Sequence, residues 1–361
     1  MKKCILITGG AGFIGSALSH QLAGGDLAIV ALDNLHPQIH ATRSRPADLH
    51  KDVVLIEGDV CARDDWDRVL NRYAPKFVFH LAAETGTGQS LTESTRHAEV
   101  NVVGTAQMLD ALTRHSAMPD KIVLTSSRAV YGEGAWRASD GSPFYPPQRD
   151  ARMLERRQWD FPGAQALPFD AASTEPRPVS IYGATKLAQE HMLISWARSF
   201  SVNYCILRLQ NVYGPGQAAD NPYTGIVPLF SRLANAGKSI PLYEDGAMQR
   251  DFVYIEDVAK ALALAMTSQT AANHTLDIGT GESITIGELA AIVSRHYDAP
   301  PPHVCALYRN GDVRHAACRP DASRTMLQWQ PRVAPAEGVP ALCDWIDSQL
   351  GTIDSDTVVT A

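Results

Sequence analysis

The feature that most constrains the fold of this chain is a glycine-rich turn near its N-terminus. An apolar run at residues 4–8 predicts a strand, and residues 16–23 predict a helix. Between them lies the string Gly9-Gly10-Ala11-Gly12-Phe13-Ile14-Gly15. Glycines at positions 9, 12 and 15 permit a tight turn, and they let the backbone approach an anionic group at the start of the helix. The glycines alone are also compatible with a tight turn that binds no ligand.

The alternation of strand and helix continues along the chain. Further strands are expected at residues 28–32, 53–57, 77–81, 121–125 and 204–209, and further helices at 65–73, 99–116 and 182–200. Strands that are separated by helices form parallel βαβ units. We therefore predict an α/β fold with a doubly wound parallel sheet (Rossmann) and a smaller C-terminal substrate-binding α/β domain.

With 361 residues, the chain is long enough for two domains. We expect a nucleotide-binding domain over residues 1–215 and a mainly substrate-binding domain over 216–350, some of whose segments return to the first domain. Residues 133–178 form an insertion rich in proline, arginine, aspartate and aromatic side chains. Because disordered linkers are poor in aromatic residues, we expect the insertion to cap the substrate pocket or to form a subunit contact. A solvated surface excursion is the alternative, and residues 351–361 are expected to form a flexible tail.

Composition excludes several classes of protein. The 32 basic and 39 acidic side chains give a net charge of −7, so the chain lacks the basic surface of a general nucleic-acid binder. Six scattered cysteines without a CxxC pair predict free thiols rather than a zinc site or a disulfide framework. No stretch of about 18 apolar residues is present, so no membrane span is expected. We expect a cytoplasmic protein without a metal site.

An acidic residue supports a nucleotide site at the glycine-rich turn. Asp33 follows the second expected strand, at about the distance from the turn that is typical of dinucleotide-binding βαβ units. A carboxylate at this position accepts hydrogen bonds from the ribose 2′-hydroxyl and repels a 2′-phosphate. We therefore expect NAD as the cofactor, in preference to NADP.

A tyrosine and a lysine four residues apart indicate the chemistry. Tyr182 and Lys186 lie on one face of the expected helix, and an ammonium group beside a phenol lowers the pKa of the phenol. Tyr182 is therefore a candidate base for a hydroxyl proton during hydride transfer. Ser127 follows the strand at 121–125, at the strand end where parallel sheets bind ligands, so its hydroxyl is a candidate partner for the reacting oxygen.

Taken in order, these motifs resemble a known family. The first part of the chain contains TGGxGFIG, Asp33, Gly58-Asp59-Val60, His80-Leu81-Ala82-Ala83, Asn101, SSxxVYG and YxxxK. The second part contains Leu207-Arg208-Leu209-Gln210-Asn211-Val212-Tyr213-Gly214-Pro215, the RDFVYIED string at 250–257, and Arg309-Asn310-Gly311-Asp312. Over about 300 residues, this set is similar to the extended short-chain dehydrogenase/reductase family, in its NAD-dependent nucleotide-sugar epimerase and dehydratase branch.

The resemblance implies a role for each matching residue. It implies cofactor contacts for Gly9, Gly12, Phe13, Ile14, Gly15, Asp33, Asn34, Asp59, Val60, Leu81, Ala82, Ala83, Asn101, Tyr182 and Lys186. The implied catalytic set is Ser127, Tyr182 and Lys186. Substrate contacts are expected from Glu84, Thr87, Ser90, Ser127, Arg128, Asn211, Val227, Tyr243, Arg250, Arg309 and Asp312. Among these, Asn211, Arg250 and Arg309 would bind a diphosphate, because guanidinium groups suit phosphate oxygens, and Tyr243 would stack on the nucleobase.

Two departures from the family pattern bear on the reaction. Nucleotide-sugar 4,6-dehydratases place Asp-Glu directly after the catalytic hydroxyl, whereas this chain has Arg128-Ala129. The interval of 55 residues between Ser127 and Tyr182 is longer than the usual family spacing by roughly one loop. The chain resembles UDP-glucose 4-epimerases, and its SSRAVYGEG string with the long interval is similar to a dTDP-L-rhamnose 4-epimerase-like group.

The resulting hypothesis is an NAD-dependent nucleotide-sugar 4-epimerase, acting on a dTDP- or UDP-linked hexose or 6-deoxyhexose such as dTDP-L-rhamnose. Transient oxidation at C4 would give a 4-keto sugar, and hydride would return to the opposite face. A reductase, decarboxylase or dehydratase-type oxidoreductase on the same scaffold is the first alternative, and a non-catalytic NAD(H) sensor is a remote one. The expected partners are a nucleotide-diphosphate sugar and a second copy of the chain in a homodimer, with no nucleic acid and no membrane.

Overall fold

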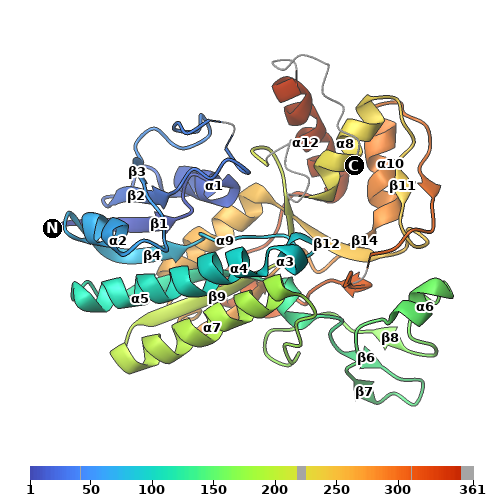
Figure 1. Ribbon diagram of the computed structural model, residues 1–361, viewed down its shortest axis with the longest axis horizontal. Coiled ribbons are helices and arrows are strands. Elements are labelled where there is room, and N and C mark those ends of the chain that lie inside the picture. The colour runs from blue at the N-terminus through green and yellow to red at the C-terminus, as the bar shows by residue number, and fades with distance from the viewer. Residues whose placement is uncertain (41, 218–224, 310, 351–361) are drawn as a thin grey trace.

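The centre of the protein is a seven-stranded parallel sheet, seen in a computed structural model that describes residues 1–40, 42–217, 225–309 and 311–350 (Figure 1). The strand order is β13-β9-β5-β4-β1-β2-β3. These strands are β1 (Lys2–Thr8), β2 (Ala28–Asp33), β3 (Val54–Glu57), β4 (Tyr73–His80), β5 (Lys121–Ser127), β9 (Asn203–Leu209) and β13 (His274–Ile278). The sheet confirms the predicted doubly wound α/β fold.

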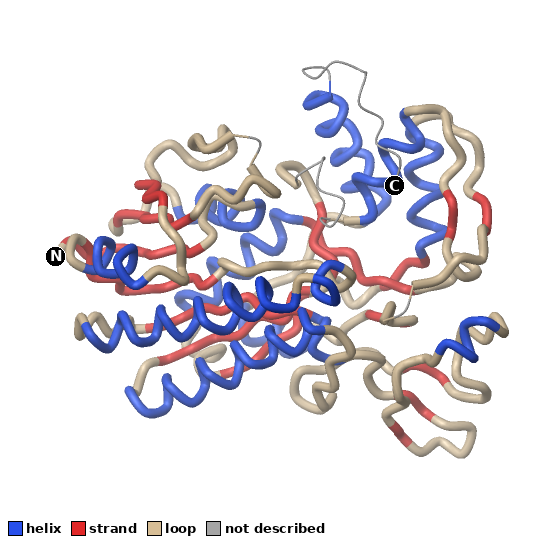
Figure 2. Tube along the Cα trace, viewed as in Figure 1, coloured by secondary structure: helices blue, strands red, loops and turns tan. Residues whose placement is uncertain are grey.

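Helices cover both faces of this sheet (Figures 1 and 2). One face packs against α1 (Phe13–Leu22), α9 (Ile255–Thr267) and α11 (Asp321–Leu327), and the other packs against α2 (Arg63–Leu70), α5 (Gly104–Arg114) and α7 (Ile181–Phe200). Successive strand residues point to opposite faces, so Ile5 and Ile7 belong to one core and Cys4 and Leu6 to the other. Strands buried on both faces explain the continuous apolar runs in the sequence.

The strand order reverses between β1 and β4. The chain builds β2 and β3 on one side of β1, and then β4, β5, β9 and β13 on the other side. Parallel sheets bind ligands at such a point, outside the carboxyl ends of the strands. Thr8, His80 and Ser127 end β1, β4 and β5 at this edge.

A smaller body lies beside the sheet and is formed mainly by the C-terminal part of the chain (Figure 1). It contains the strands β10 (Asn211–Tyr213), β12 (Gln249–Tyr254), β14 (Ser283–Thr285) and β16 (His315–Ala316), and the pair β11 (Pro241–Leu242) and β15 (His303–Val304). Its helices are α8 (Ile226–Asn235), α10 (Ile286–His296) and α12 (Pro335–Leu350), which share one apolar core. The helix α9 and the strand β13 return to the large sheet. A domain boundary at residue 215 stays a prediction, and the expected tail at 351–361 lies outside the described residues.

The insertion at residues 133–178 forms a small body of its own (Figure 1, lower right). It contains a three-stranded antiparallel sheet of β7 (Pro143–Phe144), β6 (Trp136–Arg137) and β8 (Gln165–Ala166), together with the short helix α6 (Ala151–Glu155). Strands of two residues are too short to produce a sequence period, which is why none of these elements could be predicted.

Two predicted helices differ from the structure. The helix expected at 65–73 is α2, which ends at Leu70, because residues 73–75 pair with residues 2–4 as the start of β4. The helix expected at 99–116 is divided into a π-helical turn at Glu99–Val103 and α5. Such wider turns are frequent at functional sites, and this one carries the buried Asn101. The six cysteines are free, as predicted, and no described helix could cross a membrane.

Candidate active site

A cleft of about 1160 Å³ lies at the carboxyl ends of the parallel strands, where the strand order reverses. Most of the predicted ligand-binding residues line it. They are Gly9, Gly12, Phe13, Ile14, Gly15, Asp33, Asn34, Asp59, Val60, Leu81, Ala82, Ala83, Glu84, Thr87, Ser127, Arg128, Tyr182, Asn211 and Val227. The structure therefore brings together residues from eight separate stretches of the sequence that motif analysis connected only by family resemblance.

Seven predicted residues do not line this cleft: Asn101, Lys186, Ser90, Tyr243, Arg250, Arg309 and Asp312. No residue of the insertion at 133–178 lines it either, and a role of the insertion as a cap over the substrate pocket stays a prediction. The insertion contributes instead to a separate, smaller pocket of about 430 Å³. Its predicted role as a subunit contact stays a prediction.

Close packing explains the glycines of the N-terminal turn. Gly9 has a φ of +64°, and a Cβ atom on it would lie 2.8 Å from the backbone of Ala82. A Cβ atom on Gly15 would lie 2.6 Å from the carbonyl oxygen of Gly9. Gly12 is the N-cap of α1 and offers no side chain to the first amides of this ten-residue helix, whose start lines the cleft. Helix amides in this arrangement bind phosphate groups.

The carboxylate of Asp33 fixes the end of β2 against the same turn. Its Oδ2 atom accepts a 2.9 Å hydrogen bond from the Ala11 amide, and Oδ1 accepts a 2.9 Å bond from the Leu35 amide. Each carboxylate oxygen can accept more than one hydrogen bond, so Asp33 retains the capacity to bind ribose hydroxyls in the cleft that it lines. Helix amides for a pyrophosphate and a carboxylate for a ribose are the groups that NAD requires, and the residues present fit it.

Ser127 and Tyr182 lie in the wall of the cleft. Ser127 begins a 3₁₀ turn at Arg128–Tyr131, and its Oγ accepts a 3.1 Å hydrogen bond from the Ala129 amide. Tyr182 lies in the first turn of α7. Burial raises the pKa of Tyr182 above its ordinary value, while the hydrogen bond to Ser127 and the charge of Arg128 lower it. The cation that lowers this pKa in the structure is Arg128, and the role of Lys186 in tuning the phenol stays a prediction.

Lys186 is buried one turn further along α7, behind the wall of the cleft. Burial lowers the pKa of its ammonium group to about 7, and the negative charge of Glu190 opposes this shift. Glu190 accepts hydrogen bonds from Ser126 Oγ and, at 2.7 Å, from Arg208 Nη2. The ion pair therefore fixes the carboxylate on the next turn of the helix and holds a negative charge near the lysine.

Two guanidinium groups form the cationic side of the site. Arg128 donates a 2.7 Å hydrogen bond from Nε to Asn211 Oδ1, and Arg250 donates from Nη1 to the carbonyl oxygens of Gln249 and Arg314 at 2.8 and 3.3 Å. Burial and the charge of Arg250 lower the pKa of Arg128 to about 9. Within the described part of the chain, neither guanidinium is hydrogen-bonded to a carboxylate. Neighbouring cations without such partners suit a polyanionic ligand.

Three further predicted substrate contacts, Tyr243, Arg309 and Asp312, belong to the C-terminal part of the chain. The guanidinium carbon of Arg309 lies 4.9 Å from the centroid of the Tyr243 ring, so it covers one face of the ring predicted to stack on a nucleobase. The charge of Asp312 acts on both Arg128 and Arg250 and opposes the lowering of their pKa values. The ligand contacts of Tyr243, Arg309 and Asp312 stay predictions.

The loop after β4 is held by residues that do not reach the cleft themselves. Asn101 accepts a 2.8 Å bond from the Glu84 amide and donates a 3.0 Å bond to the Glu84 carbonyl, so its amide group fixes the loop backbone. Arg96, in α4 (Ser94–Ala98), binds both carboxylate oxygens of Glu84 at 2.9 and 2.8 Å. Ser90, in α3 (Gln89–Thr92), is buried and donates to the Thr87 carbonyl at 2.7 Å. Asn101 and Ser90 are therefore placed as supports of the loop.

Motif analysis missed other residues that organise the site. His80 is buried between the hydroxyls of Thr8 and Thr105, with Nδ1 2.7 Å from the first and Nε2 2.9 Å from the second. Burial lowers the pKa of His80 to about 3, so the imidazole is neutral and joins β1, β4 and α5 beneath the cleft. His80 belongs to a motif string, whereas Arg96 carries no sequence signal because its partner Glu84 lies on a different element.

The fold and the site define a class of protein. A glycine-rich turn with Asp33 at the end of β2, and Ser127 with Tyr182 in the same cleft, are the arrangement of an extended short-chain dehydrogenase/reductase. The family model described as "NAD dependent epimerase/dehydratase family" matches residues 5–150 and 161–279. The chain belongs to this family, and its cofactor is NAD.

Individual relatives agree with this assignment. The chain is 53% identical over 348 residues to a dTDP-L-rhamnose 4-epimerase of Burkholderia thailandensis, with 96% of each chain covered. It is 30% identical over 335 residues to a UDP-glucose 4-epimerase of Mycolicibacterium smegmatis, with 92% of this chain and 95% of that protein covered. Among solved structures, the UDP-glucose 4-epimerase of Thermotoga maritima with UDP-glucose has a TM-score of 0.79 at 27% identity, covering 96% of this chain and 99% of that one. The Thermus thermophilus UDP-glucose 4-epimerase in complex with NAD has a TM-score of 0.75 at 28% identity, with the same coverage.

Proposed function

We propose that this protein is an NAD-dependent nucleotide-sugar 4-epimerase and that its substrate is dTDP-L-rhamnose. The identity of 53% over 96% of both chains supports the substrate. The observation that carries the reaction type is the composition of the cleft at the end of β5. Ser127 and Tyr182 line it together, and the two residues after Ser127 are Arg128 and Ala129, neither of which carries a carboxyl group like those of the Asp-Glu pair of a dehydratase.

The two hydroxyl groups perform the proton transfer. Tyr182 takes the proton of the sugar C4 hydroxyl, while the Ser127 hydroxyl hydrogen-bonds the same oxygen and fixes its position. Bound NAD, held at the glycine-rich turn and Asp33, would supply the hydride acceptor for C4 and, in its reduced form, the hydride donor to the opposite face of the sugar. Tyr182 then returns the proton to the C4 oxygen. Because oxidation and reduction balance within one cycle, no second redox substrate is required.

The cationic side of the cleft anchors the nucleotide. The 4-keto sugar must present both of its faces, so the substrate has to be held by its diphosphate while the sugar turns. Arg128 and Asn211, which line the cleft, and Arg250, whose charge acts on Arg128 from behind the lining, supply a guanidinium pair and an amide for this purpose. The sugar end is bordered by Glu84 and Thr87, on the loop after β4.

Two further properties belong to this proposal. We infer that the enzyme works as a homodimer, as the sequence resemblance implies. We also infer a cytoplasmic location, because six unpaired thiols are stable in a reducing compartment.

The experiment that tests the function follows the stereochemistry at C4. Purified protein with NAD is incubated separately with dTDP-L-rhamnose and with UDP-glucose, and the products are examined by proton NMR. Inversion at C4 of dTDP-L-rhamnose converts the large H3–H4 and H4–H5 couplings of the rhamnose ring into the small couplings of a 6-deoxytalose ring. Turnover of UDP-glucose alone would assign a different substrate, and a product with altered redox state in either reaction would contradict 4-epimerisation.

A further inference from the structure

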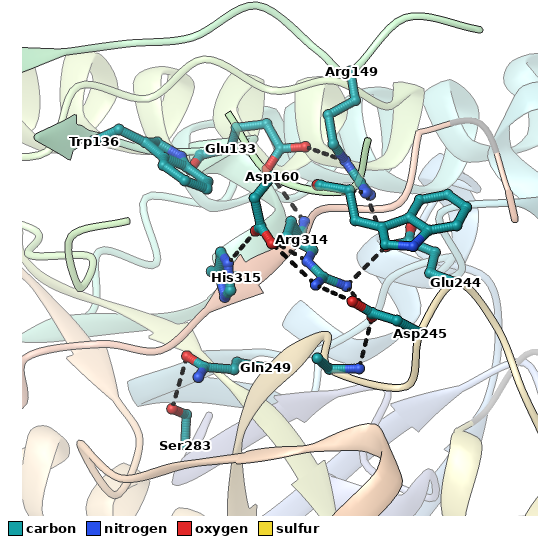
Figure 3. A network of polar contacts seen from close by, with 12 residues as sticks. Glu133, Trp136, Arg149, Asp160, Glu244, Asp245, Gln249, Ser283, Arg314 and His315 are labelled. Carbon is teal, nitrogen blue, oxygen red and sulfur yellow. Dashed lines mark hydrogen bonds and ion pairs between the residues drawn. The ribbon is translucent and has the colours of Figure 1, made fainter. Parts of the chain in front are cut away.

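The insertion is joined to the C-terminal body by an arginine with almost no exposure. The side chain of Arg149 is 2% exposed, and it donates from Nη1 to Glu244 Oε2 at 2.9 Å and from Nη2 to the Asp312 carbonyl at 2.7 Å. Its Nε atom lies 3.4 Å from Glu133 Oε1. Arg149 of the insertion is therefore bound to Glu244 and Asp312, which are far from it in the sequence. Figure 3 shows Arg149 beside Glu244.

A second arginine completes the network from the other side. Arg314, also 2% exposed, binds Asp245 through two parallel bonds of 2.7 and 2.8 Å and binds Asp160 of the insertion through two bonds of 3.1 Å. It shares Glu244 with Arg149, at 3.0 Å. Figure 3 shows Arg314 between Asp160 and Asp245. Bidentate pairs of this kind specify geometry as well as energy, and removal of one partner leaves a buried charge unpaired.

The backbone of one residue, Arg314, links this network to Arg250. Glu133 Oε2 accepts a 3.2 Å hydrogen bond from the Arg314 amide, and the Arg314 carbonyl accepts a 3.3 Å bond from Arg250 Nη1. The same carbonyl accepts a 3.1 Å bond from the Gln249 amide, in the strand β12 that carries Arg250. The backbone of Arg314 thus fixes the position of Arg250 through its carbonyl group, while its amide group is bound to Glu133 of the insertion.

Main-chain hydrogen bonds also place the segment that contains Arg314 between β12 and the insertion. β16 pairs with β12, with Arg250 opposite Ala316. On the other side of this segment, the Phe169 amide donates to the Ala317 carbonyl at 2.8 Å, and the Arg319 amide donates to the Phe169 carbonyl at 2.7 Å. Residues 312–319 therefore lie between the strand of Arg250 and the insertion.

Among the described residues, the carboxylates in this network are bound to Arg149 and Arg314, and not to Arg250. Glu133, Glu244, Asp160 and Asp245 bind Arg149 and Arg314, and none of them is hydrogen-bonded to Arg250 in the described part of the chain. A carboxylate on Arg250 would compete with a phosphate for the guanidinium group. The family model leaves residues 151–160 unmatched, so Asp160 belongs to a part of the insertion that lies outside the family pattern.

We propose that the insertion is a brace that sets the position of Arg250 for the substrate diphosphate, and that Arg149 and Asp160 are its positioning residues. This inference rests on the proposed function in one respect, the binding of the diphosphate by Arg250. The brace acts on binding of the nucleotide rather than on the chemistry at C4, because its contacts end at Arg250 and do not include Ser127 or Tyr182.

The test measures the affinity of the NAD-loaded enzyme for dTDP alone, by titration calorimetry, and the kinetics with dTDP-L-rhamnose. In Asp160→Asn and Arg149→Lys we expect dTDP affinity to fall about 3-fold to 10-fold, with a matching rise in KM and kcat within about 2-fold of wild type. Asp140→Asn is the matched control, because Asp140 is on the same insertion but hydrogen-bonds its neighbour Ser142. Affinity equal to that of the control in both variants, whatever their melting temperature, would overturn the brace.

A double-mutant cycle shows whether the effect passes through Arg250. Arg250→Ala should itself weaken dTDP binding, and Arg149→Lys should then have no additional effect in that background. Equal losses from Arg149→Lys in both backgrounds would show that the insertion acts elsewhere and would overturn the proposal. If Arg250→Ala leaves dTDP affinity unchanged, the diphosphate role of Arg250 is wrong and the brace falls with it, while C4 inversion measured by NMR still stands as a separate result.

Discussion

Arg128 donates a 2.7 Å hydrogen bond from its Nε atom to Oδ1 of Asn211. Arg128 directly follows Ser127 at the end of β5, whereas Asn211 begins β10 on the side of the C-terminal body. The bond therefore connects two parts of the site. One part contains the hydroxyl groups that we expect to transfer the proton, and the other contains the residues that we expect to hold the diphosphate. We therefore expect the side chain of Arg128 to affect both the proton transfer at the sugar and the binding of the diphosphate.

Replacing Arg128 with Gln should change the pH dependence of turnover. The charge of Arg128 lowers the pKa of Tyr182, so its removal raises that pKa and moves the acid limb of the kcat profile to higher pH. Loss of a charge-assisted contact with the diphosphate should also lower kcat/KM by about 10-fold to 100-fold. Arg137→Gln, on the exposed side of the insertion, provides the control. An acid limb at its wild-type position would separate Arg128 from the phenol.

Replacing Tyr182 with Phe should remove most of the turnover and leave NAD binding intact. Only the phenolic oxygen is lost, and general-base catalysis contributes about 10²-fold to 10⁴-fold. Steady-state kinetics with dTDP-L-rhamnose and calorimetry with NAD measure the two effects separately. Turnover close to the wild-type rate would place the proton acceptor elsewhere in the cleft.

Replacing Lys186 with Met should stabilise the protein without its cofactor. Burial lowers the pKa of Lys186 to about 7, below the value of about 10.4 for a lysine in an unfolded chain. The unfolded state therefore binds more protons between these values, and the free energy of unfolding of the wild type rises with pH across this window. The advantage of the variant should be largest below pH about 7 and vanish above the unfolded-state pKa, as measured by urea denaturation at several pH values. A difference that does not depend on pH would contradict the lowered pKa.

How much of this arrangement could be predicted depends on how the residues are connected. The glycine turn, Asp33 and the Tyr182–Lys186 pair were predictable because each lies within one βα unit or one helix, where spacing determines geometry. The side-chain contacts of Asn101 were not, since its amide is bound to Glu84 across a π-helical turn that residue propensities do not indicate.

The brace was not predictable for the same physical reason. Arg149 and Glu244 are separated by 95 positions, and their pairing depends on how the insertion docks on the C-terminal body. Composition showed only that the insertion is rich in arginine and aromatic side chains, which is equally compatible with an exposed face. Only the three-dimensional structure distinguishes Arg149 and Arg314, which are paired with carboxylates, from Arg250, whose guanidinium group binds no carboxylate among the described residues.

Replacing Asp33 with Asn should weaken NAD binding and reduce the preference for NAD over NADP. Both carboxylate oxygens of Asp33 accept hydrogen bonds from main-chain amides, so an Asn would direct its own NH₂ group at one of these donors. The negative charge that repels a 2′-phosphate is lost at the same time. We expect NAD affinity to fall by about 10-fold or more and the NAD/NADP affinity ratio to shrink, measured by calorimetry with both cofactors. Tighter binding of NADP than of NAD by the wild type would overturn the assignment of Asp33, and the exposed Asp52→Asn variant serves as control.

Running the reaction in D₂O should give the C4 epimer without carbon-bound deuterium. In a 4-epimerase the hydride that leaves C4 returns to C4, and only the hydroxyl proton passes through Tyr182, so solvent never reaches carbon. A 4,6-dehydratase must remove the C5 proton and protonate the departing C6 hydroxyl, which requires an acid and a base beyond Ser127 and Tyr182. Arg128 and Ala129 occupy the two positions after Ser127, and neither carries the carboxyl group that a dehydratase has there. Mass spectrometry and NMR of the product provide the measurement. In the parallel reaction with UDP-glucose, which has a C6 hydroxyl, deuterium at C5 or a product lighter by one water would show that another residue of the cleft supplies the missing acid and base. Deuterium at C3 or C5 of the product from dTDP-L-rhamnose would likewise show that the protein is not a simple 4-epimerase.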